Sequence, residues 1–470
     1  MHDFTATYTD LYQINMAQVY FQQGKHEHKA VFDYFFRKLP FEGGYAVFAG
    51  LETLLEVLED FKFSDDDLEF LKDQGLDSEF LNYLKGFRFE GNIISATEGD
   101  IVFPTRPVLQ VEANMVEAQL IETILLNILN FQTLVATKAS RIRKSAGEQM
   151  LIDFGMRRAQ STGAYHASRA AFIGGFEATS NVVAGKDFNI PISGTMAHSF
   201  VQSYDDELTA FRDFANSHPE NTILLIDTYD TLKIGLPNAI TVGKEMKSRG
   251  EELKGVRLDS GDLSYLAKKC RKAFDEAGLE HVKIAASNQL DEYVIRSLKE
   301  QKGPIDVFGV GTNLVIGDPD AALDGVYKLA FANDKPRIKL SENLAKLTLP
   351  HKKQVYRLRN SEGKLTGADA VTLRDETDIK HMNHPFDVSK SLSFKNCNEE
   401  ALLHYVMKDG IRTEPPKRLE DIKVYSRKRL AEFSEEFQRF ENPHLYKIGI
   451  SDQLLKEREA LRNHYKNKDA

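Results

Sequence analysis

Between residues 149 and 313 the sequence repeats one pattern: a short apolar run ending in polar or glycine residues, then a segment with helical spacing. Such alternation of strands and helices is typical of a parallel sheet. This many strands in so short a stretch favour a barrel, incomplete or irregular, over an open half-sheet. The runs are QMLIDFG (149–155), AFIGGF (171–176), IPISGTMAH (190–198), TILLIDTYD (222–230), KGVRLDSGD (254–262), VKIAASN (282–288) and IDVFGVGTN (305–313).

The residues able to do chemistry share one position in this pattern, at or just after the carboxyl end of a strand. In a parallel barrel these ends converge on one mouth, where the following loops build the active site. We therefore expect a single pocket that gathers Asp153, His198, Asp227, Asp230, Arg257, Asp259, Ser287, Asn288 and Gly311.

The segment before residue 115 predicts a small second domain, either α/β or β-rich. Before residue 115 we expect helices over 10–22 and 51–58 and strands over 31–37 and within 86–113, followed by one or two helices over 114–146. Strands and turns are expected from 331 to 395. A charged helical tail is expected over 414–469, in which YSRKRLAEFSEEFQRF predicts a solvated surface helix.

The expected fold is therefore an irregular, incomplete parallel α/β barrel with a second α/β domain built from the N-terminal and C-terminal segments. The corresponding boundaries are 1–120 for the N-terminal domain, 121–330 for the barrel, and 331–470 for a segment that packs back on the N-terminal domain.

The charge balance argues against a nucleic-acid partner. Lys and Arg number 61 against 70 Asp and Glu, so 61 − 70 gives −9, and an acidic surface repels phosphate backbones. A local basic pocket could still bind a phosphate-bearing small molecule.

Cys270 and Cys397 lack the spacing of a disulfide framework or a zinc site. Neither a signal-peptide pattern nor an uninterrupted apolar span is present, so we expect a cytoplasmic protein without membrane contact.

Two motifs offer cationic or titratable groups at strand ends. FGMRRAQ (154–160) places two arginines where they could bind phosphate or carboxylate, or could simply begin a solvated helix. GTMAH (194–198) places His198 where it could act as a general base, bind phosphate or accept a phosphoryl group. A structural histidine is the alternative.

Three further motifs supply carboxylates and glycines. IDTYDT (226–231) and RLDSGD (257–262) each offer two aspartates three apart, which could bind ribose hydroxyls or the waters of a Mg²⁺ ion. Helix capping is the competing explanation, and we expect it for Asp262. GVGTN (309–313) could hold a phosphate with backbone amides.

In their order, these motifs resemble the nicotinate phosphoribosyltransferases, with weaker similarity to the nicotinamide enzyme. The resemblance covers residues 9 to 330 and, more loosely, continues to 360. Besides the motifs above, it rests on TDLYQINM (9–16), FDYFFRKLP (32–40), GYAVFAGLE (44–52), LLNILNFQTLVATKA (125–139), SNVVAGK (180–186), ASNQLDE (286–292) and FGVGTNL (308–314).

The resemblance implies a type II phosphoribosyltransferase of Preiss-Handler NAD salvage. Family members make nicotinate mononucleotide and pyrophosphate from nicotinate and phosphoribosyl pyrophosphate (PRPP). ATP hydrolysis would drive this ligase-type reaction through a phosphohistidine at His198, with Mg²⁺ as the metal cofactor. The family also implies a homodimer with active sites at the subunit interface.

The resemblance assigns roles residue by residue. Phe154 and Tyr12, the latter from the partner subunit, would sandwich the pyridine ring, and Arg157 would face its carboxylate. The implied catalytic residues are His198, Asp227, Arg257 and Asp259, with both aspartates binding ribose, pyrophosphate and Mg²⁺, directly or through water, and Arg257 on the phosphates. The implied phosphate contacts are Ser287, Asn288, Gly311 and Thr312 for the 5-phosphate, and Arg37 near the subunit boundary.

One position bears on substrate choice, and other enzyme classes stay open. Nicotinamide-specific relatives carry an aspartate where this chain has Asn181, and an anion there would repel a carboxylate, so Asn181 favours nicotinate. Nicotinamide or quinolinate transfer are the alternatives within the class. A barrel lyase or aldolase acting on a sugar phosphate would need a lysine or an acid/base pair at a strand end. A non-catalytic binding protein would not need such crowded polar strand ends.

Overall fold

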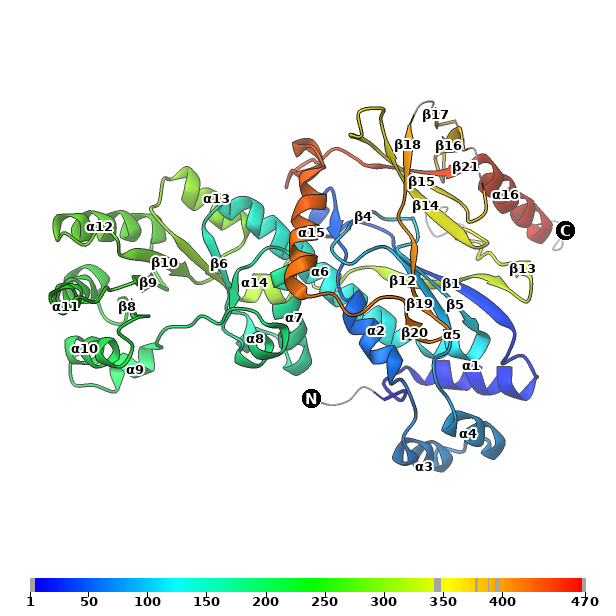
Figure 1. Cartoon of the computed structure of the whole chain (residues 1–470), viewed down its shortest axis with the longest axis horizontal. Helices are drawn as coiled ribbons and strands as arrows, with labels where there is room; N and C mark the ends of the chain where they lie inside the picture. The colour runs from blue at the N-terminus through cyan, green and yellow to red at the C-terminus, as the bar shows by residue number, and fades with distance from the viewer. Residues whose placement is uncertain (1–4, 342–347, 377–378, 388, 394–396, 467–470) are drawn as a thin grey trace. The chain divides into compact units, whose positions relative to one another are not determined.

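The computed structural model describes residues 5–341, 348–376, 379–387, 389–393 and 397–466 (Figure 1). The chain forms two compact units, one of residues 1–137 with 322–470 and one of residues 138–321. The first boundary falls inside the continuous helix α6 (Glu122–Ala146), so no break in secondary structure marks it. Within the described ranges, no helix combines the length and apolar character that crossing a bilayer requires.

The central unit, residues 138–321, contains a six-stranded sheet in the order β7-β6-β11-β10-β9-β8, and every neighbouring pair is parallel. Strands β7 and β8 form the two edges, and no pairing between described residues closes the sheet. The expected incomplete parallel α/β barrel is confirmed. The strands are β6 (Met150–Asp153), β7 (Ala178–Thr179), β8 (Ile223–Leu225), β9 (Gly255–Leu258), β10 (Lys283–Ser287) and β11 (Val307–Val310).

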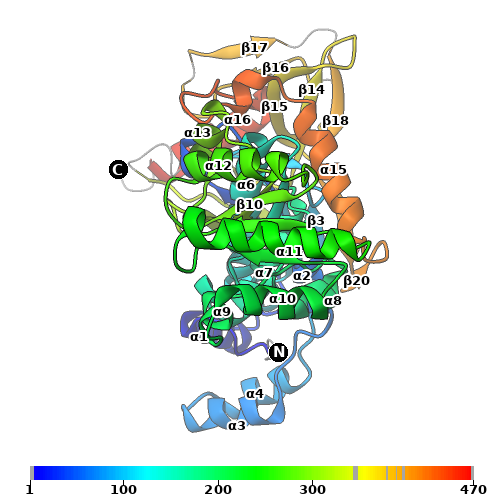
Figure 2. The same cartoon turned by 90° about the vertical axis from the view of Figure 1, so that its left-hand side faces the viewer.

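Helices follow the strands of this unit. Figure 2 shows α12, α11 and α10 in front of the strands. Helix α12 buries Ala267, Cys270 and Phe274, a helical spacing that places its apolar residues on one face. The helices are α7 (Ser161–Ile173), α8 (Val182–Phe188), α9 (His198–Gln202), α10 (Glu207–Ser217), α11 (Leu236–Ser248), α12 (Leu263–Glu276), α13 (Glu292–Glu300) and α14 (Thr312–Val315).

Two of the expected strands are wrong. Residues 171–176 form the end of α7 and its turn, and the strand follows at β7. An apolar run fits a buried helix as well as a strand, and Gly175, with φ of +112°, allows the turn that ends this helix. Residues 190–198 form only one bridge, between Ile192 and Thr179, and α9 begins at His198.

In the other unit, residues 1–137 with 322–470, both ends of the chain share one seven-stranded sheet, in the order β13-β12-β1-β5-β3-β19-β20. Strand β1 pairs antiparallel with β5 and with β12, and β3 pairs with β19. The expected domain built from both chain ends is confirmed. The strands are β1 (Lys29–Phe36), β3 (Asn92–Ser95), β5 (Leu109–Asn114), β12 (Gly325–Ala332), β13 (Lys335–Pro336), β19 (His404–Lys408) and β20 (Ile411–Arg412).

A second, six-stranded sheet of this unit has the order β17-β16-β21-β15-β14-β18. The C-terminal tail is not wholly helical, because β21 inserts between β16 and β15. The strands are β14 (Lys353–Arg359), β15 (Leu365–Leu373), β16 (His381–Asn383), β17 (Ser391–Ser393), β18 (Asn398–Ala401) and β21 (Lys447–Ser451); a two-stranded ladder joins β2 (Ala46–Val47) and β4 (Ile101–Val102).

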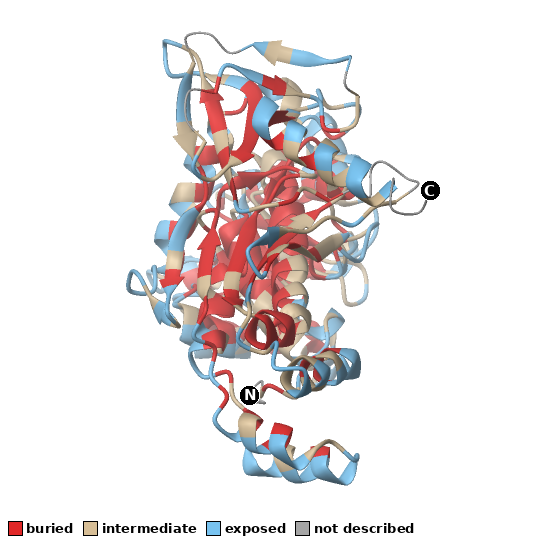
Figure 3. Ribbon diagram, turned by 90° about the vertical axis from the view of Figure 1, so that its right-hand side faces the viewer, coloured by how far each residue is buried: buried red, intermediate tan, exposed pale blue. Residues whose placement is uncertain are grey.

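The helices of this unit include two that the sequence reading missed. Ser64 forms a capping box with Asp67, and Asp77 caps the next helix, so the missed pair does carry N-terminal signals. Figure 3 shows exposed residues on both of these helices and buried residues in the strands. The helices are α1 (Leu11–Gln22), α2 (Leu51–Glu59), the missed α3 (Asp65–Asp73) and α4 (Ser78–Lys85), α5 (Met115–Leu120), α15 (Leu419–Ala431) and α16 (Asp452–Lys466).

The expected solvated helix over 425–440 is also partly wrong. Helix α15 ends at Ala431, and Arg429 on it is buried, with its Nε 2.9 Å from a carboxylate oxygen of Asp100. Mixed charge in the sequence does not distinguish a solvated face from one that pairs with a buried carboxylate.

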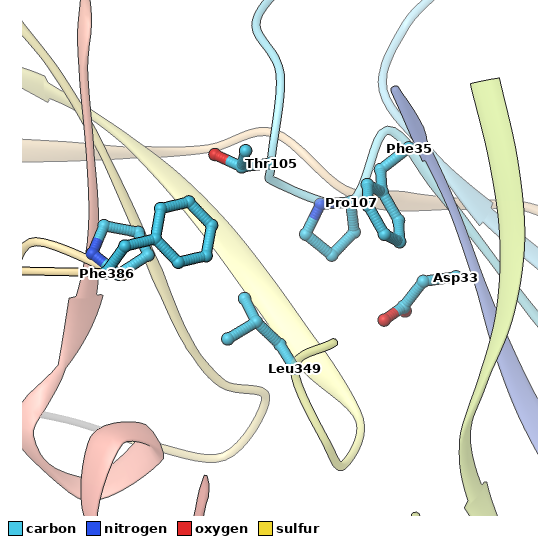
Figure 4. A pocket seen from close by; sticks show the side chains of 7 residues that line it. Asp33, Phe35, Thr105, Pro107, Leu349 and Phe386 are labelled. Atoms are coloured by element: carbon cyan, nitrogen blue, oxygen red, sulfur yellow. The ribbon is translucent and has the colours of Figure 1, made fainter. Parts of the chain in front are cut away.

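Figure 4 shows a small cavity in this unit, beside Asp33. Its volume of about 20 Å³ holds about one water molecule. The Asp33 carboxylate accepts from Gln110 at 2.6 Å and lies 2.9 Å from the Lys353 ammonium nitrogen. Burial raises the pKa of Asp33 and lowers the pKa of Lys353. The cavity is too small for an organic substrate.

Candidate active site

The end of β6 carries an aspartate that is buried beneath the site. Asp153 accepts from the Gly155 amide at 2.8 Å, from the Ser168 hydroxyl at 2.7 Å and from the Thr179 hydroxyl at 2.8 Å. Burial raises the pKa of Asp153, although these hydrogen bonds oppose the shift. The sequence predicted that Asp153 lines the pocket, and this prediction is wrong. Because both carboxylate oxygens accept hydrogen bonds, Asp153 instead fixes the turn after β6.

The next residue, Phe154, lies against β11. Its amide donates to the Val310 carbonyl at 2.8 Å. A Cβ added at Gly309 would lie 2.4 Å from two carbons of the Phe154 ring, so the ring can occupy this place only beside a glycine. The Arg257 guanidinium carbon is 6.0 Å from the ring centroid. An aromatic face and a cation therefore lie together at the ends of three strands.

Arg257 forms no ion pair with another described residue, although Asp259 and Asp227 lie near enough to influence its charge. One of its terminal nitrogens donates to the Met196 carbonyl at 3.3 Å, while its Nε is buried and has no acceptor among the described residues. Burial lowers the pKa of Arg257; the charges of Asp259 and Asp227 oppose this, and that of Arg157 adds to it. Arg157 is exposed in the short turn Met156–Arg158. The region is prepared for an anion.

Asp227 and Asp259 are joined directly. The Asp259 amide donates to Asp227 Oδ2 at 2.9 Å, and the Ser260 hydroxyl donates to the same oxygen at 2.5 Å. Asp227 Oδ1 is buried and has no donor among the described residues. Ser287 donates through its hydroxyl to Asp259 Oδ1. The ends of β8, β9 and β10 thus share one hydrogen-bonded cluster, in which one carboxylate oxygen accepts no hydrogen bond from the described part of the chain.

His198 completes this cluster. Its Nδ1 is 3.1 Å from the Thr228 hydroxyl, and its Nε2 is 3.9 Å from Asp259 Oδ2. The four predicted catalytic residues therefore lie in one region. Asp259 contacts both Asp227 and His198. Arg257 donates to the Met196 carbonyl, two residues before His198, and is influenced by the charges of both aspartates.

The predicted phosphate residues lie on two adjoining loops. Ser287 ends β10, and Asn288 follows it with a left-handed φ of 87°. Gly311 and Thr312 follow β11, the strand that pairs with β10. The side-chain nitrogen of Asn313 donates to the backbone carbonyls of residues 289 and 290, at 3.4 and 3.3 Å, and links the two loops.

Three predicted residues have other surroundings. Tyr12, 50% exposed on α1, and Arg37, which follows β1, belong to the other unit. Arg37 Nε is buried without an acceptor among the described residues. Asn181 is buried as the N-cap of α8, where its side-chain oxygen accepts from the Ala184 amide at 3.3 Å and its nitrogen donates to the Ala164 carbonyl at 3.4 Å.

Two aspartates of the paired motifs cap helices. The carboxylate of Asp262 accepts from the Tyr265 amide at 3.0 Å, as expected. Asp230 was expected at the mouth, yet it accepts from the amides of Leu232 and Lys233, at 3.1 and 2.9 Å, at the start of a π-helical turn. Each motif thus contributes its first aspartate to the cluster and its second to a helix.

Sequence reasoning missed three residues of this region. Thr228 and Ser260 stand inside IDTYDT and RLDSGD, so their motifs contained the signal. Glu207 had no such signal. It is 4% exposed, its Oε2 accepts from the Asn238 amide at 3.0 Å, and its Oε1 has no donor among the described residues. Burial and, to a lesser extent, the charge of Asp227 raise the pKa of Glu207.

The donor set fits a weakly held Mg²⁺ ion. No group of three or more His, Cys, Asp or Glu side chains able to hold a metal occurs among the described residues. Mg²⁺ usually keeps several waters and binds through one or two carboxylates and the substrate's phosphates. Asp227, whose Oδ1 has no donor among the described residues, and the adjacent Asp259 meet that requirement.

This incomplete parallel α/β barrel gathers polar residues at the carboxyl ends of its strands, the face at which barrel enzymes have their active sites. The chain belongs to the nicotinate phosphoribosyltransferase family. Family models match residues 7–130 (nicotinate phosphoribosyltransferase N-terminal domain), 150–389 (the family itself) and 352–458 (C-terminal domain).

Individual relatives match nearly the whole chain. The nicotinate phosphoribosyltransferase of Bacillus subtilis is 47% identical over 460 residues, covering 96% of this chain and 94% of the relative. That of Bos taurus is 32% identical, with 95% and 94% covered. The crystal structure of human nicotinic acid phosphoribosyltransferase superimposes with a TM-score of 0.87 at 31% identity, covering 96% of this chain and 99% of the human one.

Proposed function

We propose that this enzyme forms nicotinate mononucleotide and pyrophosphate from nicotinate and PRPP, in NAD salvage, and that ATP hydrolysis drives the reaction through a phosphohistidine at His198. The observation that carries the proposal is the strand-end cluster, in which Asp227 Oδ1 and Arg257 Nε are buried and have no hydrogen-bond partner among the described residues. A cation-bound, phosphorylated sugar would supply both partners.

In the proposed reaction, the pyridine nitrogen forms a bond to ribose C1 while the bond from C1 to pyrophosphate breaks, and the bonding pair leaves with the pyrophosphate oxygen. No nucleophilic side chain is needed. The protein holds the reactants in line and stabilises the developing charge. Arg257 faces the phosphates, and Asp227 and Asp259 bind ribose hydroxyls and magnesium-bound water. Mg²⁺, when bound, offsets the pyrophosphate charge.

The proposed substrate contacts extend the cluster on both sides. Phe154 provides one face for the pyridine ring, Tyr12 of the partner subunit the other, and Arg157 faces the carboxylate. A neutral residue at 181 leaves that carboxylate unrepelled. The proposed 5-phosphate contacts are Ser287, Asn288, Gly311 and Thr312, with Arg37 as a further phosphate contact near the boundary of a homodimer.

Phosphorylation of His198 would couple ATP hydrolysis to substrate affinity. The phosphoryl group adds about −1.5 to −2 charges. His198 Nε2 is only 3.9 Å from the Asp259 carboxylate, so the new charge acts directly on a residue proposed to bind the ribose hydroxyls and the magnesium-bound water. The chemical displacement itself does not use the imidazole.

The test is nicotinate mononucleotide formation from radiolabelled nicotinate and PRPP, with and without ATP, in the wild type and His198→Ala. We expect the variant to retain basal transfer and to lose stimulation by ATP. Full ATP stimulation in His198→Ala would remove the phosphohistidine from the proposal. Loss of basal transfer in Asp259→Ala, without loss of thermal stability, is the matching expectation for the cluster.

A further inference from the structure

The loop between β10 and α13 has a strained backbone. Asn288 and Gln289 have φ angles of 87° and 49°, so two consecutive non-glycine residues are left-handed. Such conformations are unfavourable for residues with a Cβ and persist only where the surroundings impose them. Ser287 and Asn288 are proposed phosphate contacts, so whatever imposes this conformation also shapes the phosphate site.

A buried ion cluster holds the end of this loop. Glu292, the first residue of α13, is fully buried. One of its carboxylate oxygens is 2.7 Å from Arg141 Nε and the other is 2.5 Å from Lys138 Nζ. Both cations lie on α6 and are themselves at most 2% exposed at their side chains.

Further contacts fix the direction of the same segment. The Ser145 hydroxyl donates to the Glu292 carbonyl at 2.6 Å, and Arg141 donates to the Tyr293 hydroxyl at 3.0 Å. Asp291 caps α13 through the amides of residues 293 and 294, at 2.9 and 2.7 Å. From helix α14, the Asn313 side-chain amide donates to the carbonyls of residues 289 and 290, at 3.4 and 3.3 Å. Contacts from α6 therefore hold the residues that follow the strained pair, and Asn313 of α14 holds Gln289 of the pair itself.

A purely apolar contact would bury α13 against α6 as well, because a buried ion pair contributes little net stability over well-packed apolar residues. The ion cluster additionally fixes the position and orientation of Glu292. Arg141 and Lys138 bind separate oxygens of its carboxylate, which defines where the first turn of α13 begins. A phosphate site formed by backbone and short side chains gains affinity when it is held in its bound conformation beforehand.

We propose that Glu292, held by Lys138 and Arg141, is a positioning residue that fixes the Asn288–Gln289 conformation and thereby the site of the 5-phosphate of PRPP. This inference rests on the proposed function. It implies that weakening the cluster lowers affinity for the phosphorylated sugar and leaves recognition of the pyridine substrate unchanged.

The test uses the full-length enzyme, with ribose 5-phosphate as a calorimetric probe and steady-state kinetics for both substrates. Glu292→Gln keeps the shape of the side chain and removes its charge; Lys138→Met keeps the Arg141 contact. For Glu292→Gln we expect about a tenfold rise in the Kd of ribose 5-phosphate and in the KM of PRPP, and less than a twofold change in the KM of nicotinate. Lys138→Met should show the same pattern, about threefold.

Glu177→Gln is the control, because Glu177 also binds an arginine of α6, Arg143 at 2.5 Å, and its other described side-chain contact is the Leu151 amide and not the loop. It should leave ribose 5-phosphate binding unchanged. Equal losses for both substrates, or unchanged binding in Lys138→Met, would overturn the inference, and Lys138→Met decides the matter if Glu292→Gln fails to fold. A wild type unable to make nicotinate mononucleotide would instead contradict the proposed function.

Discussion

The ring of Phe154 occupies the space that a side chain at Gly309 would fill. Two ring carbons lie 2.4 Å from the Cβ position of residue 309, closer than non-bonded carbon atoms can approach. Since β6 and β11 pair through Gly309 and Ile152, the backbone cannot move away without breaking the ladder. The place of the ring is therefore set by the absence of a side chain on the neighbouring strand.

Gly309→Ala should displace the Phe154 ring while the sheet stays folded. We expect the KM of nicotinate to rise roughly 10- to 100-fold, as misplacement by about 1 Å costs, with a smaller effect on PRPP. Gly86→Ala is the control, because its nearest heavy atom is 3.8 Å from the Cβ position. Unaltered nicotinate kinetics in Gly309→Ala would show that Phe154 does not bind the ring.

Thr228→Val removes the hydrogen-bond partner of His198 Nδ1 and leaves the shape of the side chain. A hydrogen bond of this kind contributes about 1 kcal/mol, so ATP stimulation should fall roughly fivefold while ATP-independent transfer persists. Thr228→Ser should restore the stimulation. If valine and serine at position 228 behave alike, the Thr228 hydroxyl does not orient the imidazole.

Mixing of two inactive variants should show whether Tyr12 and Asp259 of one active site come from different subunits. If each site combines Tyr12 of one protomer with Asp259 of the other, Tyr12→Ala and Asp259→Ala are each inactive alone. Random exchange of protomers then yields mixed dimers with one intact site, and about a quarter of wild-type activity returns. Activity that does not rise on mixing, in a sample whose mass shows that mixed dimers have formed, would place Tyr12 within its own subunit's site.

His166 should make the central unit sensitive to acid. Burial and the charge of Arg169 lower the pKa of His166 from 6.5 to about 4. The unfolded chain therefore binds this proton more readily, so the stabilising contribution is complete above pH 6.5 and is lost as the pH falls towards 4. The difference amounts to about 3 kcal/mol of unfolding free energy.

Denaturant unfolding of the wild type and His166→Gln at several pH values measures this difference in unfolding free energy. The variant should lose less stability than the wild type between pH 6.5 and 4, and replacement of the exposed His218 by Gln should not change the profile. Parallel profiles for the wild type and His166→Gln would contradict the assignment.

The sequence predicted the cluster because parallel strands present their carboxyl ends at one edge of a sheet. His198, Asp227, Arg257 and Asp259 therefore came together although they are distant in the chain. Asp153 has the same position on its strand, yet it is buried by bonds to Ser168 and Thr179. No spacing rule connects those residues to it, so its role could not be read from the pattern.

The remaining differences arise where local patterns are ambiguous. The apolar run 171–176 suits a buried helix end as well as a strand, and only the packing of α7 decides between them. Arg429 and Glu207 look like ordinary surface charges in the sequence. Their burial depends on Asp100 and Asn238, which come from distant parts of the chain. The sequence pattern does not show which distant residue a single charged side chain will contact, so the burial of these two residues could not be predicted.

The most direct test of the central claim is the wild-type reaction itself, measured as nicotinate mononucleotide and pyrophosphate released from nicotinate and PRPP with Mg²⁺, with and without ATP. We expect the two products in equal amounts, a higher rate with ATP, and far slower reaction with nicotinamide. Absence of product from nicotinate, or preferential use of nicotinamide or quinolinate, would contradict the account.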